Sequence, residues 1–178
     1  MVSGQKSKDL TGEKISVLLV DDSRIFRSFI EDHFRNDAFF EIIGSTWNGS
    51  KALEFLEKRI PDIIVLDVEM PELTGLETLG KINQIKALKG IAPNDIGVIM
   101  LSGQSSECTD NSMQALELGA FDVISKPPGY EDRFQIKAFL KDLNEKLLAF
   151  AARKRPELLP EKVRLATVNR SFEKSNIR

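Results

Sequence analysis

The sequence has little cysteine and little histidine, with one residue of each, and no long hydrophobic run. A single cysteine, Cys108, excludes a disulfide framework within the chain and is typical of a reducing compartment. The only histidine, His33, falls inside a predicted helix, which favours a structural role over that of a catalytic base. The N-terminus lacks an apolar stretch, so no signal peptide is predicted, and no run approaches the length of a membrane span. These absences favour a cytoplasmic protein without membrane insertion.

The composition fits one small domain. The chain has 178 residues, 42% hydrophobic and 29% charged, enough for one core and too few for two ordinary domains. From residue 153 onward, eight Lys or Arg face three Glu, a net charge of +5, while the rest of the chain carries −7. Pro156 and Pro160 favour a solvated linker over a nucleic-acid or lipid contact for this basic tail. We expect a flexible segment over 1–14, a domain over 15–152 and a linker-like tail over 153–178.

Strand and helix signals alternate along this domain. Apolar runs predict strands, while apolar residues at helical spacing, capping residues and a following Pro or Gly predict helices. These βα units, without a hairpin signal, predict a parallel α/β sheet with helices on both faces. The expected strands are 15–20, 40–46, 62–66, 96–101 and 120–125, and the expected helices are 24–36, 49–60, 74–89, 109–118 and 131–151.

Polar residues of different chemical kinds follow four of the predicted strands. Asp21 and Asp22 follow the first strand, Asp67 the third, Ser102 the fourth and Lys126 the fifth. In a parallel sheet these side chains meet at the carboxyl edge, where open α/β sheets bind ligands. Three acids repel one another unless a cation neutralises them, and hard oxygen ligands favour Mg²⁺. Because a hydroxyl and an ammonium suit phosphoryl oxygens, the pattern predicts phosphoryl chemistry on a carboxylate.

These strand ends lie within longer motifs. VLLVDDS, IIVLDVEMPELTGLE, VIMLSGQ and ALELGAFDVISKP occur in this order. Together they resemble the receiver domain of two-component response regulators, and DVEMP, TGLE and the last motif are most similar to the receiver of the chemotaxis protein-glutamate methylesterase (CheB) family. The resemblance covers about residues 15 to 150, and the order of the fragments makes it specific. It implies a flavodoxin-like (CheY-like) doubly wound five-stranded sheet with strand order 2-1-3-4-5.

The resemblance also implies roles for the acidic residues. Asp67 matches the aspartate that accepts a phosphoryl group from a phosphohistidine on a sensor histidine kinase. Asp21 and Asp22 match the pair that holds Mg²⁺, directly or through water, and one of them also suits a helix cap. The resemblance also implies that Asp67 is a metal ligand, and Glu69 matches the position whose backbone carbonyl completes the metal shell.

The same resemblance implies a switch. Ser102 matches the hydroxyl that moves toward the phosphorylated aspartate, and Lys126 the cation that pairs with the phosphoryl oxygens. In this family the bond between Lys126 and Pro127 is typically cis, which aims the ammonium into the site. Val123 stands where receivers usually carry an aromatic switch residue, and strand alternation predicts that Phe121 points to the same face. New hydrogen bonds at Ser102 and Lys126 would bias a two-state rearrangement.

Other functions stay open at this level. A Mg²⁺-dependent phosphohydrolase with an aspartyl nucleophile has similar geometry, but such enzymes usually have Asp-x-Asp where this chain has Asp21, Asp22 and Ser23. An unphosphorylated interaction module would be expected to have lost Asp67 or Lys126. A third alternative is the regulatory fragment of a longer methylesterase, whose catalytic Ser, His and Asp triad has no counterpart here.

We therefore expect a self-phosphorylating receiver rather than an enzyme with turnover. The resemblance implies a sensor histidine kinase of the chemotaxis type as a partner, together with an output domain or a downstream protein. Neither nucleic-acid binding nor membrane insertion is expected.

Overall fold

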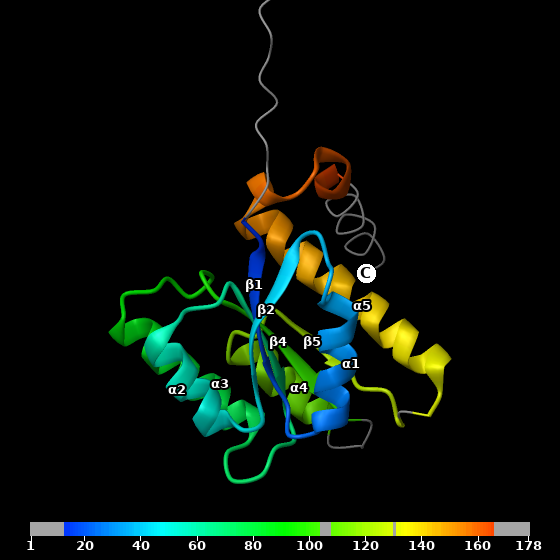
Figure 1. Cartoon of the computed structure of the whole chain (residues 1–178). Coiled ribbons are helices and arrows are strands. Elements are labelled where there is room, and N and C mark those ends of the chain that lie inside the picture. Colours follow the sequence, from blue (N-terminus) through cyan, green and yellow to red (C-terminus); the bar gives the residue numbers. More distant parts are fainter. Residues whose placement is uncertain (1–12, 104–107, 130, 166–178) are drawn as a thin grey trace, which may run out of the picture.

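The computed structural model describes residues 13–103, 108–129 and 131–165. Its centre is a sheet of five parallel strands in the order β2-β1-β3-β4-β5 (Figure 1). The strands are β1 (Ile15–Val20), β2 (Phe40–Thr46), β3 (Ile63–Asp67), β4 (Gly97–Ser102) and β5 (Asp122–Ser125). This order confirms the doubly wound, flavodoxin-like fold that the sequence predicts.

A helix follows each strand and crosses one face of the sheet. The helices are α1 (Arg24–Phe34), α2 (Gly49–Lys58), α3 (Gly75–Leu88), α4 (Cys108–Glu117) and α5 (Arg133–Lys154), followed by the short helix η1 (Pro156–Leu158). Helices α1 and α5 cover one face of the sheet, and α2, α3 and α4 cover the other (Figure 1). All the predicted strands and main helices are present, with ends that differ from the predictions by at most three residues.

Side-chain caps fix the starts of the helices that follow the site loops. At α3, the Thr74 hydroxyl accepts a hydrogen bond from the Glu77 N–H, and the Glu77 carboxylate accepts one from the Thr74 N–H. This is the predicted capping box. Asparagine, serine and aspartate caps act at three other helices, namely Asn48 at α2, Ser23 at α1 and Asp132 at α5. These caps satisfy N–H groups that would otherwise lack a partner in the first turn of each helix, next to the carboxyl edge of the sheet.

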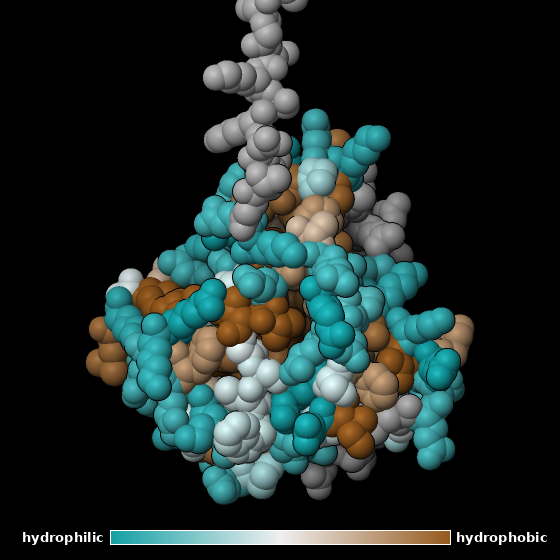
Figure 2. Space-filling model, viewed as in Figure 1, coloured by the Kyte–Doolittle hydropathy of each residue, from teal (hydrophilic) through white to brown (hydrophobic). Residues whose placement is uncertain are grey.

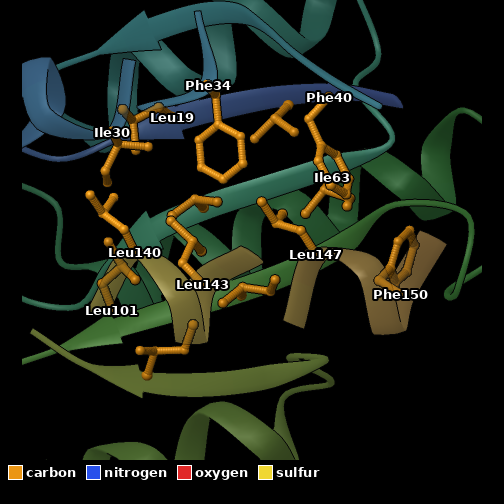
Figure 3. Close-up of a cluster of buried hydrophobic side chains, with 14 of the residues drawn as sticks. Leu19, Ile30, Phe34, Phe40, Ile63, Leu101, Leu140, Leu143, Leu147 and Phe150 are labelled. Carbon is orange, nitrogen blue, oxygen red and sulfur yellow. The ribbon is translucent and has the colours of Figure 1, made fainter. Parts of the chain in front are cut away.

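Two apolar layers form the core, one on each face of the sheet. Strand β1 contributes to both, because successive side chains of a strand point to opposite faces. Val17 and Leu19 belong to the layer under α1 and α5, and Leu18 and Val20 belong to the opposite layer. Figure 3 shows the first layer, in which α5 residues such as Leu143 lie against the strands. Burial on both faces explains why the strands read as continuous apolar runs.

The described part of the C-terminal tail is packed on the domain, where the sequence predicts a linker, while residues 166–178 of that tail lie outside the described residues. After α5, residues 155–165 stay with the folded body, and Leu159 lies in the layer under α1 and α5 with only 4% of its surface exposed. The Arg155 guanidinium lies 3.2 Å from a carboxylate oxygen of Glu13 and 3.2 Å from one of Asp62. Long-range contacts thus hold a segment whose prolines and mixed charge suggest a solvated chain.

Basic side chains at the end of α5 are also paired within the molecule. The Arg153 guanidinium lies 5.3 Å from the centroid of the Phe121 ring, and Lys154 forms an ion pair with Asp95.

Figure 2 shows a largely hydrophilic face on which hydrophobic residues gather between α1 and α2. Within the described part of the chain, no helix is long and apolar enough to span a membrane. Most of the predicted N-terminal segment, residues 1–12, lies outside the described residues.

Candidate phosphorylation and metal site

Four of the five strands deliver a polar side chain to the carboxyl edge of the sheet. Asp67 ends β3 and Ser102 ends β4, while Asp21 directly follows β1 and Lys126 directly follows β5. The Lys126 Nζ atom lies 2.7 Å from Asp21 Oδ2 and 2.8 Å from Asp67 Oδ2. The parallel sheet thus brings together residues that are far apart in the sequence.

Three carboxylates form a compact acidic cluster. One oxygen atom from each of Asp21, Asp22 and Asp67 lies within 4.8 Å of the others. Asp21 and Asp67 are buried, whereas Asp22 is exposed. Buried carboxylates that face one another are costly unless cations compensate them, and Lys126 supplies one positive charge against three negative ones. The remaining negative charge and the hard oxygen donors fit a divalent cation such as Mg²⁺.

Burial is the largest influence on the pKa values of the two buried carboxyl groups in the cluster. Loss of hydration raises the pKa of Asp67 from 3.8 to about 6, although the Lys126 ammonium acts in the opposite direction. Burial also raises the pKa of Asp21. For Lys126, burial alone would lower the pKa, but the carboxylates of Asp67 and Asp21 outweigh it and raise the pKa above its ordinary value. A cation that compensates these carboxylates therefore competes with protons for them.

Ser102 contributes a hydroxyl group to the same edge. Its Oγ atom is buried, and no hydrogen-bond partner for it occurs among the described residues. Its carbonyl oxygen accepts a hydrogen bond of 2.7 Å from the Lys126 N–H, so the two residues are joined through the backbone. A buried hydroxyl without a partner loses hydration without compensation, unless a ligand supplies the missing hydrogen bond. The Ser102 hydroxyl is therefore available to donate a hydrogen bond to a ligand oxygen.

Close backbone contacts hold the two buried acids. Arg27 donates a hydrogen bond of 2.6 Å from Nη1 to the carbonyl oxygen of Asp21. The N–H of Glu69 donates one of 3.3 Å to Asp67 Oδ1, which leaves Oδ2 to Lys126. At the start of α3, a Cβ atom on Gly75 would lie 2.0 Å from the Asp67 carbonyl oxygen. Only glycine fits at this position, so the loop after β3 can pack directly on the strand end.

Two predicted details of β5 are wrong. No peptide bond among the described residues is cis, and the bond between Lys126 and Pro127 is therefore trans. Phe121 and Val123 do not share a face, since Phe121 packs on the layer under α1 and α5 and Val123 on the opposite layer. Strand alternation fails here because β5 begins one residue after Phe121, whose ring instead meets the Phe150 ring edge-on at 5.3 Å.

One contact of the site has no signal in the sequence. The Lys126 Nζ atom lies 4.8 Å from the centroid of the Phe26 ring in α1. Helical periodicity indicates that Phe26 is buried, but not which residue it meets.

The single histidine, His33, lies in the last turn of α1, where its ring contacts the ring of Phe34.

The family model of the response regulator receiver domain matches residues 17–136. This range contains the acidic cluster, Ser102 and Lys126. The chain belongs to the response regulator receiver family. Phosphorylation on an aspartate is general for such receivers, and the sheet edge of this one carries Asp21, Asp22 and Asp67.

Individual relatives carry the name protein-glutamate methylesterase/protein-glutamine glutaminase. The chain is 38% identical over 168 residues to the protein-glutamate methylesterase/protein-glutamine glutaminase of Bacillus subtilis. This match covers 90% of this chain and 44% of that relative. The chain is 42% identical over 113 residues to the corresponding protein 1 of Syntrophomonas wolfei, covering 64% of this chain and 30% of the relative. The chain thus spans less than half the length of these relatives.

A solved structure agrees with these relatives. The crystal structure of the response regulator domain of Thermotoga maritima CheB is similar with a TM-score of 0.63 and 29% sequence identity, covering 78% of this chain and 97% of that one. The resemblance to methylesterase receivers that the sequence motifs predict is confirmed.

Proposed function

We propose that the receiver accepts a phosphoryl group on Asp67 from a phosphohistidine of a sensor histidine kinase of the chemotaxis type, in the cytoplasm. The observation that carries the proposal is the arrangement around this carboxylate. Asp67 is buried beside two further acids, its Oδ2 atom is paired with Lys126, and the nearby Ser102 hydroxyl has no partner among the described residues. These are the groups that a phosphoryl group and its counter-ion require.

Asp21, Asp22 and Asp67 would hold the Mg²⁺ ion, with the backbone carbonyl of Glu69 as a further ligand. When bound, the ion neutralises negative charge on the phosphoryl oxygens and on the carboxylates. The donor set supports this assignment, because all the proposed ligands are oxygen atoms, which Mg²⁺ prefers.

The transfer itself is an in-line displacement. A carboxylate oxygen of Asp67 attacks phosphorus, the bond between phosphorus and the donor imidazole nitrogen breaks, and the nitrogen keeps the electron pair. The Lys126 ammonium stabilises negative charge on the equatorial oxygens, and its proton stays on nitrogen throughout. The Ser102 hydroxyl donates to a phosphoryl oxygen once the acyl phosphate has formed.

The product is a switch at the edge of the sheet. Lys126 exchanges one of its two carboxylate partners for a phosphoryl oxygen, and Ser102 gains a hydrogen bond. Ser102 ends β4 and Lys126 directly follows β5. The new contacts therefore bias the position of the loops that follow these two strands. Val123 and Pro127 would move with these loops. Because position 123 holds valine, this switch would work without the change of aromatic rotamer that receivers usually show.

We further propose that this receiver is the regulatory fragment of a longer protein-glutamate methylesterase. The support comes from the names of its relatives and from the identity with the Bacillus subtilis protein, which extends over 90% of this chain. Its output partner would then be a catalytic domain, in the same chain or another.

Phosphorylation of the intact protein tests the function directly. Incubation with Mg²⁺ and acetyl phosphate should add the mass of one phosphoryl group, and the Asp67→Asn variant should gain none. Undiminished phosphorylation of the variant would overturn the assignment. Rapid turnover of small phosphate esters by the wild-type protein would instead favour the phosphohydrolase, which has a similar arrangement of acids.

A further inference from the structure

An aromatic ring borders the cation of the site in addition to its two carboxylate partners. Phe26 lies in the first turn of α1, is completely buried, and places its ring centroid 4.8 Å from Lys126 Nζ. The same ammonium is paired with Asp21 and Asp67, and the Lys126 side chain is only 14% exposed. The ring therefore occupies space that water would fill around an exposed ammonium.

A ring face suits this position for an electrostatic reason. The π electrons give the face a negative potential, which attracts a desolvated ammonium without adding a formal charge. A third carboxylate in its place would increase the repulsion within the acidic cluster and compete for the metal. The attraction also depends weakly on direction, so the ammonium can turn from Asp67 toward a phosphoryl oxygen and keep the contact.

The Phe26 ring also packs against a second aromatic ring. Its centroid lies 5.0 Å from that of Phe139 in α5, with an angle of 50° between the ring planes. Both phenylalanines belong to the buried layer under α1 and α5. Because this layer fixes the ring, the ring limits where the ammonium can lie.

We propose that Phe26 is a positioning residue for phosphoryl transfer, whose ring holds the Lys126 ammonium at the place where the phosphoryl oxygens arrive. The inference rests on the proposed function of Asp67 and adds a group that does not touch the substrate. Phe26 acts only through Lys126, and it acts through the electrons of its ring as well as through its shape.

Graded fluorination of the ring separates these two contributions. Mono-, di- and trifluorinated phenylalanine, incorporated at position 26 of the full chain, keep the shape of the ring while they weaken its negative face. We expect the rate constant for phosphorylation by acetyl phosphate with Mg²⁺ to fall stepwise along the series, by about tenfold in all. A side chain that only fills space would leave the rate unchanged.

Phe34 is the matched control. It lies in the same helix and the same buried layer, and its ring meets the ring of Phe40 edge-on. The same series at Phe34 should leave the rate constant unchanged. In the Lys126→Met background, the rate constant should no longer depend on fluorination at Phe26, because the ammonium that interacts with the ring is absent.

Three results would overturn the role of Phe26: a flat series at position 26, equal slopes at Phe26 and Phe34, or a slope that persists in Lys126→Met. If the wild-type protein takes up a phosphoryl group on Asp67 but the series is flat, only the role of Phe26 is refuted. If the wild-type protein takes up none, the proposed function and the role of Phe26 fail together.

Discussion

The two ion pairs of Lys126 make this side chain the most informative one to replace. Its ammonium lies 2.7 Å from an oxygen of Asp21 and 2.8 Å from one of Asp67. The Lys126→Met variant keeps an unbranched side chain but changes the charge of the cluster from −2 to −3, because three carboxylates remain without the ammonium. Removing one partner of a buried ion pair costs about 3 to 5 kcal/mol. We expect the metal-free variant to lose stability on the order of 3 kcal/mol at about pH 8.

The size of this loss depends on pH. Burial raises the pKa of Asp67 from 3.8 to about 6, so between these values the folded protein binds more protons than the unfolded chain and its stability falls as pH rises. Without the Lys126 ammonium the pKa of Asp67 rises further. The pH range over which stability falls with rising pH therefore extends to higher pH in the variant. Protonation at acidic pH removes the uncompensated charge, and the difference between variant and wild type should therefore shrink.

Urea unfolding, followed by circular dichroism at about pH 8 and about pH 5 with and without Mg²⁺, measures both effects. We expect Mg²⁺ to stabilise Lys126→Met more than the wild type, because the ion replaces part of the lost positive charge. Lys86→Met is the control. Lys86 is 4% exposed, but its ammonium donates to the carbonyl oxygens of Pro93 and Ile96, away from the cluster. A loss in Lys126→Met that changes with neither pH nor Mg²⁺ would refute the electrostatic role.

Three further predictions concern the metal, the tail and the nucleophile. Asp22→Ala should weaken Mg²⁺ binding in calorimetric titration without lowering the unfolding free energy, since Asp22 is exposed; unchanged affinity would count against this ligand. Leu159→Ala should cost about 2 to 5 kcal/mol in urea unfolding, whereas Leu165→Ala, at 58% exposed, should cost little. Equally small losses would show that the tail is not part of the folded body. Because attack requires an ionised Asp67, the initial rate of phosphorylation at limiting Mg²⁺ should fall as pH drops through about 6; a constant rate across this range would contradict the raised pKa.

The sequence predicts the fold and the acidic edge because both depend on local patterns. Strands buried on both faces read as apolar runs, and the polar residue that ends each run marks the carboxyl edge of the sheet. The sequence alone therefore places four residues together at this edge, namely Asp21, Asp67, Ser102 and Lys126. Their pairing distances and burial could not, because these depend on the register between strands.

The features that sequence reasoning missed depend on partners far away in the chain. Phe26 has the periodicity of any buried helix residue, and only the tertiary structure places its ring beside Lys126. Leu159 lies in a segment rich in prolines and charged residues, but its side chain packs in the apolar core. Arg155 forms ion pairs with Glu13 and Asp62, which precede β1 and β3. Alternation predicts the wrong face for Phe121, because alternation holds only inside a strand and Phe121 precedes β5.

The most direct test of the proposed function is to locate the phosphoryl group. The wild-type protein is treated with acetyl phosphate and Mg²⁺, its acyl phosphate is reduced with labelled borohydride, and the label is mapped by peptide mass spectrometry. We predict a single labelled residue, Asp67, and no label when Mg²⁺ is withheld. Label on Asp21 or Asp22, or none on any aspartate, would contradict the account of this site.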